Sequence, residues 1–220
     1  LFFASIIHMI KLHKLSYGSK KEVVKLIEKS SDFILCIVLG MTLGIVSKYL
    51  DTVAVDGSWL TGFLHFLGNL FTRLGIWVLI ATLVAAYSKT WRRAAINTFV
   101  FFIGMLISYY AYSAFLFGFF PTGYFILWGG IALVSPLLAA VVWKAKNNER
   151  LAMFLPALPM GLLLSLSLSI GLFYIDLTHY EELIMYVTLC LVFYKNQKQM
   201  VISIGLSIII AIILSISSLY

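Results

Sequence analysis

Four polar side chains recur at every fourth position of an otherwise apolar stretch, WLTGFLHFLGNLFTR, at positions 59–73. They are Thr61, His65, Asn69 and Arg73. A four-residue step advances roughly 400° around an α-helix, so these side chains share one broad face. An imidazole, an amide and a guanidinium on one face can hydrogen-bond a small ligand, and the guanidinium favours an anionic one. The four residues are therefore candidate ligand-binding residues.

The helix predicted over 58–72 can take two positions. It can lie in the outer membrane interface, with its polar face toward water and its aromatic rings toward lipid. It can also tilt into a helical bundle as a re-entrant segment, so that the polar face lines a wet pocket. The apolar segment 74–88 that follows is too short, at about 1.5 Å per residue, for a hydrocarbon core of about 30 Å. If the span over 74–88 is lengthened by residues from 58–72, Arg73 lies below the membrane surface, where a charge needs a partner.

Further polar residues are candidates for the same site. Five carboxylates are predicted on the same side of the membrane as Arg73 and are candidate charge partners for it: Asp51, Asp56, Asp176, Glu181 and Glu182. The segment SYYAYS places Tyr109 and Tyr112 near a membrane end, where tyrosine forms either an aromatic belt or a hydroxyl-lined site.

The sequence contains none of the common catalytic or metal-binding motifs. The four histidines are dispersed, and Cys36 and Cys190 both lie in apolar runs without a C-x-x-C pair. We therefore predict no cofactor, no metal site and no catalytic residue, and expect that the protein is not an enzyme.

The composition indicates a membrane protein. Of the 220 residues, 62% are hydrophobic and 11% are charged, whereas soluble domains carry about a quarter charged residues. The net charge of +7 is better explained by cytoplasmic loops and anionic headgroups than by nucleic acid. The expected partner is the lipid bilayer, with a membrane or cytosolic protein subunit as a further possibility.

Spanning a bilayer takes about 20 mostly apolar residues in a helix. Seven runs approach this length: 33–50, 74–88, 94–117, 123–143, 151–175, 179–194 and 200–220. Alternating crossings put the lysine- and arginine-rich loops on one side and the acidic loops on the other, as the positive-inside rule requires. We predict an all-α integral membrane protein, a bundle of about seven transmembrane helices with a cytoplasmic N-terminus and an external C-terminus.

The chain is expected to have a cytoplasmic N-terminal segment, 1–31, followed by one transmembrane domain, 32–220. Within the first segment, 18–30 is predicted to form a basic amphipathic helix. Its lysines would contact anionic headgroups or, alternatively, dock a cytosolic partner: Lys20, Lys21, Lys25 and Lys29. Residues 1–10 lack the basic region of a secretory signal and are expected to be the end of a longer span or an interfacial anchor.

Three families resemble parts of the chain. The block FTRLGIWVLIATLVAAYSKTWRRAA, followed by FFIGMLISYYAY, resembles small multi-pass bacterial membrane proteins of unknown function, which implies a bacterial cytoplasmic membrane. Ala81-x-x-x-Ala85 and the chain's size are similar to substrate-binding subunits of energy-coupling-factor importers. Glu181-Glu182 and His65-x-x-x-Asn69 resemble fragments of CAAX-protease-like membrane enzymes, in a different order along the chain.

These observations favour a small permease or transport subunit with an outward-facing polar pocket. A non-catalytic membrane partner, such as an immunity, assembly or regulatory subunit, is the alternative. An intramembrane enzyme is the third.

Overall fold

A computed structural model describes residues 31–54, 56–118, 122–170 and 174–217 of the chain. Helices account for most of these residues. They are Ser31–Leu50, α2 (Trp59–Thr72), α3 (Leu74–Ala86), α4 (Trp91–Phe117), α5 (Thr122–Asn147), the 3-10 helix η1 (Leu151–Met153), α6 (Ala157–Ser167), α7 (Tyr180–Phe193) and α8 (Gln197–Ser217). The basic helix predicted over 18–30, and residues 1–10, lie outside the described residues.

Four of these helices are long and apolar enough to cross a membrane: Ser31–Leu50, α4, α5 and α8. The consecutive helices α2 and α3 meet the same criterion as a pair, bent by 68° at Arg73. The chain therefore has the helices of a membrane protein, and the all-α class fits. The full count of seven spans and their orientation stay predictions, because α6 and α7 are shorter than a straight span.

The span predicted over 151–175 is wrong as a single helix. The helical part divides into η1 and α6, and α6 ends at Ser167. The next residues form strand β1 (Leu168–Ile170), which pairs antiparallel with β2 (Ile175–Leu177). Pro156 immediately precedes α6 and Pro159 lies in its first turn, where a missing N–H costs no intrahelical bond. The alternation of apolar residues and serines at 166–170 suits a strand better than a helix.

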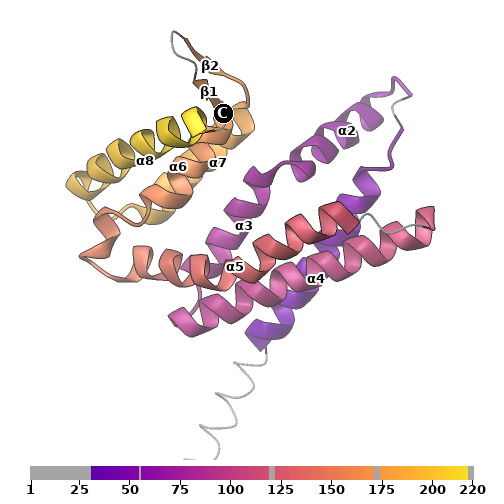
Figure 1. Cartoon of the computed structure of the whole chain (residues 1–220), viewed down its shortest axis with the longest axis horizontal. Coiled ribbons are helices and arrows are strands. Elements are labelled where there is room, and N and C mark those ends of the chain that lie inside the picture. Colours follow the sequence, from indigo (N-terminus) through magenta and orange to yellow (C-terminus); the bar gives the residue numbers. More distant parts are fainter. Residues whose placement is uncertain (1–30, 55, 119–121, 171–173, 218–220) are drawn as a thin grey trace, which may run out of the picture.

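The helices pack around two hydrophobic clusters. The first, which includes Phe101 and Met105, lies among Ser31–Leu50, α3, α4 and α5. The second, which includes Met160 and Leu189, joins α6, α7 and α8 to the ends of α3 and α5. Figure 1 shows the corresponding arrangement, with α6, α7 and α8 gathered on one side and α4 running alongside α5.

Glycines permit close contact between Ser31–Leu50 and α4. A Cβ added at Gly40 would collide with the carbonyl oxygen of Phe101, and one at Gly44 with the carbonyl oxygen of Met105. From the other side, a Cβ at Gly104 would lie 2.7 Å from the carbonyl oxygen of Ile37. Small residues spaced four apart let membrane helices approach closely, and Gly40-x-x-x-Gly44 serves this purpose here.

Candidate functional site: a cavity beside the bent helix pair

The polar face of α2 separates into three parts with different surroundings, of which the first is a helix cap. Thr61 Oγ1 donates a 2.6 Å hydrogen bond to Asp56 Oδ1 and lies 2.9 Å from Ser58 Oγ. Ser58 is the N-cap of α2 and accepts from the Thr61 amide. The hydrogen bond from Thr61, with that from the Ser58 amide, lowers the pKa of Asp56 to about 2. Thr61 and Asp56 thus stabilise the start of the helix.

The second part lines a cavity. His65 and Asn69, one turn apart, are joined by a 3.3 Å contact between His65 Nδ1 and Asn69 Nδ2. Both face a cavity of about 590 Å³ bounded by the end of Ser31–Leu50, α2, α3, α4 and α5. Between them, Gly68 is buried and its position brings α2 against the backbone of Leu50. The cavity is within the size range of small-molecule sites.

A polar group from another helix faces the same cavity. Tyr109, on α4, donates a 2.6 Å hydrogen bond from its hydroxyl to Asp51 Oδ2, and both residues line the cavity. Lys48 Nζ lies 3.9 Å from the same oxygen. Tyr112, the other predicted tyrosine, is not among the described residues that line the cavity.

Aromatic rings make up much of the remaining wall. The Trp77 side chain, which is 2% exposed, packs edge-on against Phe71 and Trp128, with ring centroids 5.7 Å and 6.2 Å apart. Its indole N–H donates a 2.8 Å hydrogen bond to the Phe71 carbonyl, which the bend leaves without a helical partner. Trp77 therefore both supports the bend and forms part of the cavity wall. Tyr110 and Tyr124 complete the aromatic lining.

The third part of the polar face is Arg73, which turns away from the cavity. It lies between α2 and α3, and its guanidinium is 3.1 Å from Glu181 Oε1 and 3.2 Å from Glu182 Oε1 at the start of α7. Glu182 is 1% exposed, and its Oε2 has no hydrogen-bond partner among the described residues. Gly75 makes room for this carboxylate, since a Cβ there would lie 2.7 Å from Glu182 Cγ.

Of the five carboxylates predicted as partners of Arg73, the structure thus brings Glu181 and Glu182 to it. Asp51 lies at the cavity and Asp56 in the cap, while Asp176 lies on the exposed strand β2. The cation of Arg73 is opposed by two carboxylates, so the geometry gives an anionic ligand little attraction at this position.

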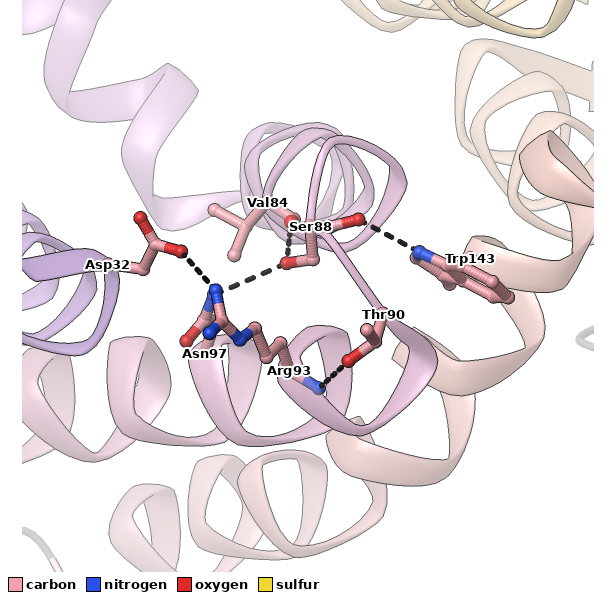
Figure 2. A network of polar contacts seen from close by, with 7 residues as sticks. All are labelled: Asp32, Val84, Ser88, Thr90, Arg93, Asn97 and Trp143. Atoms are coloured by element: carbon pink, nitrogen blue, oxygen red, sulfur yellow. Dashed lines mark hydrogen bonds and ion pairs between the residues drawn. The ribbon is translucent and has the colours of Figure 1, made fainter. Parts of the chain in front are cut away.

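A separate polar network, drawn in Figure 2, joins helix ends near the start of α4, whereas Tyr109 and the cavity lie toward the other end of that helix. Arg93 Nη1, near the start of α4, lies 3.2 Å from Asp32 Oδ2. Ser88 accepts from Trp143 Nε1 through its carbonyl, at 2.8 Å, and from Asn97 Nδ2 through its hydroxyl, at 3.3 Å. Beyond the view, Lys146 Nζ donates to the Val192 carbonyl at 2.8 Å. These contacts gather the helix ends that flank the basic loops.

Among the residues described, no group of three or more His, Cys, Asp or Glu side chains could hold a metal ion. His179 Nδ1 lies 3.1 Å from the Leu166 carbonyl, beside the hairpin, and His179 is not among the described residues that line the cavity with His65.

Sequence reasoning did not identify the aromatic wall or the glycine contacts. Trp77 and Trp128 look like ordinary span residues, and Phe71 like one of the apolar residues of the helix predicted over 58–72, because apolar rings are frequent throughout the chain. The Gly40-x-x-x-Gly44 spacing was a usable signal for close helix packing. The direction in which Trp77 points had no such signal, because it depends on the bend at Arg73.

A family model matches the chain over residues 26–220, which include all of the helices above. The chain belongs to this family, a family of unknown function (DUF6518). No curated protein and no solved structure matches the chain significantly.

Proposed function

We propose that this protein is a small permease or transport subunit that binds a small molecule in the cavity beside α2. The observation that supports this most is the cavity itself. Polar groups from three separate segments, Asp51, His65 with Asn69, and Tyr109, converge on a space of about 590 Å³ whose remaining wall is mainly aromatic and aliphatic. A mostly apolar cavity with a few convergent polar groups is typical of ligand sites.

The orientation in the membrane is part of the proposal. The contacts Asp32–Arg93, Ser88–Trp143 and Lys146–Val192 join the helix ends next to the basic loops. The positive-inside rule assigns such an end to the cytoplasm. The cavity lies at the other end of α4, near Tyr109, and would then open outward. Seven crossings in a bacterial cytoplasmic membrane are consistent with this assignment.

The bend between α2 and α3 supports a re-entrant position for α2. A half-span that turns by 68° next to a cavity resembles the broken helices of transporters, where irregular backbone is tolerated because it lines a polar space. The Trp77 indole satisfies the Phe71 carbonyl at the break, so that group is not left unpaired in an apolar environment.

The proposal is tested by a substitution that fills the cavity with a larger side chain at an exposed lining residue. Asn69→Trp places a large ring in the cavity without disturbing the core, because Asn69 is exposed. Phe63→Trp, on the same helix but away from the cavity, is the matched control. Native mass spectrometry of protein extracted from its own membrane should show a small molecule retained by wild type and by Phe63→Trp, and lost by Asn69→Trp.

Two outcomes would argue against a transport role. Stoichiometric protein partners without any bound small molecule would favour the alternative, a non-catalytic membrane partner. A bound molecule that Asn69→Trp retains as well as wild type does would place the site elsewhere and remove the cavity from the proposal.

A further inference from the structure

The charge of the cavity wall bears on the class of ligand. Among the described residues that line it, Asp51 is the one carboxylic acid, and His65 is the one other acidic or basic side chain besides the tyrosines. Arg73, the cation that the sequence pattern placed with His65 and Asn69, is held instead by Glu181 and Glu182. The wall therefore offers a carboxylate and no arginine or lysine.

The aromatic rings around Asp51 suit a cation as well. Six aromatic residues line the same cavity: Phe71, Trp77, Tyr109, Tyr110, Tyr124 and Trp128. Trp77 contacts Phe71 and Trp128, and Tyr109 contacts Tyr110. The faces of aromatic rings carry partial negative charge and attract ammonium groups, especially quaternary ones. A carboxylate together with several ring faces is a favourable environment for an organic cation and an unfavourable one for an anion.

The protein already holds a cation at the edge of this cavity. Lys48 Nζ lies 3.9 Å from Asp51 Oδ2, 5.1 Å from the centroid of the Tyr109 ring and 4.9 Å from that of Phe117. Both polar contacts of Asp51 with described side chains, from Tyr109 and from Lys48, use Oδ2. The other carboxylate oxygen, Oδ1, is therefore available to a ligand. A cationic ligand would compete with Lys48 for the Asp51 carboxylate.

We propose that the cavity binds a small organic cation, with its ammonium group at Asp51 and its apolar part among the aromatic rings. This inference rests on the proposed function, since it names the ligand class of that same cavity. It also reverses the anionic preference that the sequence pattern around Arg73 suggested.

The experiment compares three probes of similar shape and different charge. They are benzyltrimethylammonium, its uncharged isostere neopentylbenzene, and the anion phenylacetate. Binding to the protein in lipid nanodiscs is measured by equilibrium dialysis, and only the excess over Asn69→Trp is counted, which removes partition into lipid. Wild type should bind the cation at least tenfold more tightly than either other probe.

Two variants then test the role of charge in opposite directions. Asp51→Asn keeps an oxygen that can accept from Tyr109 and should weaken binding of the cation at least tenfold. Lys48→Gln removes the competing ammonium group and should strengthen it several-fold. If Asp51→Asn does not fold, the probe series on wild type and Lys48→Gln still decide the question.

The outcomes separate the two proposals. Neopentylbenzene or phenylacetate binding as tightly as the cation would overturn the cationic preference and leave the cavity as a binding site. Weaker binding of the cation to Lys48→Gln would also contradict it. Absence of any probe binding above the Asn69→Trp background would overturn both the ligand class and the proposed function.

Discussion

Arg73 Nε lies 3.2 Å from Oε1 of Glu182, a residue that is 1% exposed and belongs to a helix more than a hundred positions further along the chain. This contact joins the bend between α2 and α3 to the start of α7. It also connects the helices around the cavity to the group formed by α6, α7 and α8. Because Glu181 contributes a second carboxylate, the cluster holds one cation and two anions.

We expect Arg73→Met to destabilise the fold strongly. The substitution leaves Glu182 buried without a counter-charge, and breaking a buried ion pair typically costs about 3–5 kcal/mol. The double substitution Arg73→Met with Glu182→Met removes both charges and should recover much of the loss. Reversible unfolding in mixed micelles would measure both free energies.

Glu181→Gln is the matched control for that experiment. Its side chain is more exposed than that of Glu182, at 14% against 1%, so removing its charge should cost less. The test also needs the single substitution Glu182→Met. If the variant with both Arg73→Met and Glu182→Met loses as much free energy of unfolding as the two single substitutions added together, Arg73 and Glu182 are not energetically coupled.

Gly75→Ala should destabilise the same junction. The added Cβ would lie 2.7 Å from Glu182 Cγ and 3.1 Å from Glu182 Oε1, so the carboxylate would have to move away from Arg73. Overpacking of this kind costs about 1–3 kcal/mol. Gly62→Ala on α2 is the control: nothing lies within 4 Å of its Cβ, and alanine favours a helix by up to about 1 kcal/mol. The midpoint temperature of thermal unfolding should therefore fall in Gly75→Ala and rise in Gly62→Ala.

Gly44→Ala should separate the Ser31–Leu50 helix from α4. Its Cβ would meet the Ser108 hydroxyl and backbone of α4 at Met105, and backbone atoms cannot move aside as a side chain can. Gly129→Ala on α5 has no neighbour within 4 Å and should be tolerated. Reversible unfolding in mixed micelles should show a lower free energy of unfolding for Gly44→Ala and no loss for Gly129→Ala, and equal values for the two variants would contradict the close contact.

The cap at the start of α2 should titrate at low pH. The pKa of Asp56 is lowered to about 2, below its usual value of about 3.9, so the cap is complete above pH 4 and is lost as the pH falls through about 2. Thr61→Val removes the largest cause and should raise this pKa toward its usual value. Ser58→Ala keeps the backbone N–H donor and should raise it less. Carbon NMR of the Asp56 carboxyl group would follow the titration, and an unchanged midpoint in Thr61→Val would contradict the assignment.

The helical class and the positions of the long apolar helices could be read from the sequence, because length and hydrophobicity decide them. A carboxylate partner for Arg73 was expected among five candidates, since a charge drawn into an apolar region needs a partner, but the sequence did not distinguish Glu181 and Glu182 from the other three. The sequence did not predict that Arg73 would turn away from His65 and Asn69. That separation depends on a 68° bend that falls between two individually regular helices. The hairpin after Ser167 was missed for a related reason: hydropathy alone does not distinguish a helix from a short apolar strand.

The unequal lengths of the outer helices have a consequence for the lipids around them. The helix α7 presents Ile184, Val187 and Leu191 to the surroundings over only 14 residues, about 21 Å of rise, whereas the whole of α5 is 26 residues long, about 39 Å. If α7 is one of the proposed crossings, we expect a bilayer with a hydrocarbon core of about 30 Å to thin beside α7 and α5 to tilt within it. Lipids with longer acyl chains would then increase the hydrophobic mismatch at α7 and reduce it at α5, and lipids with shorter chains would do the reverse.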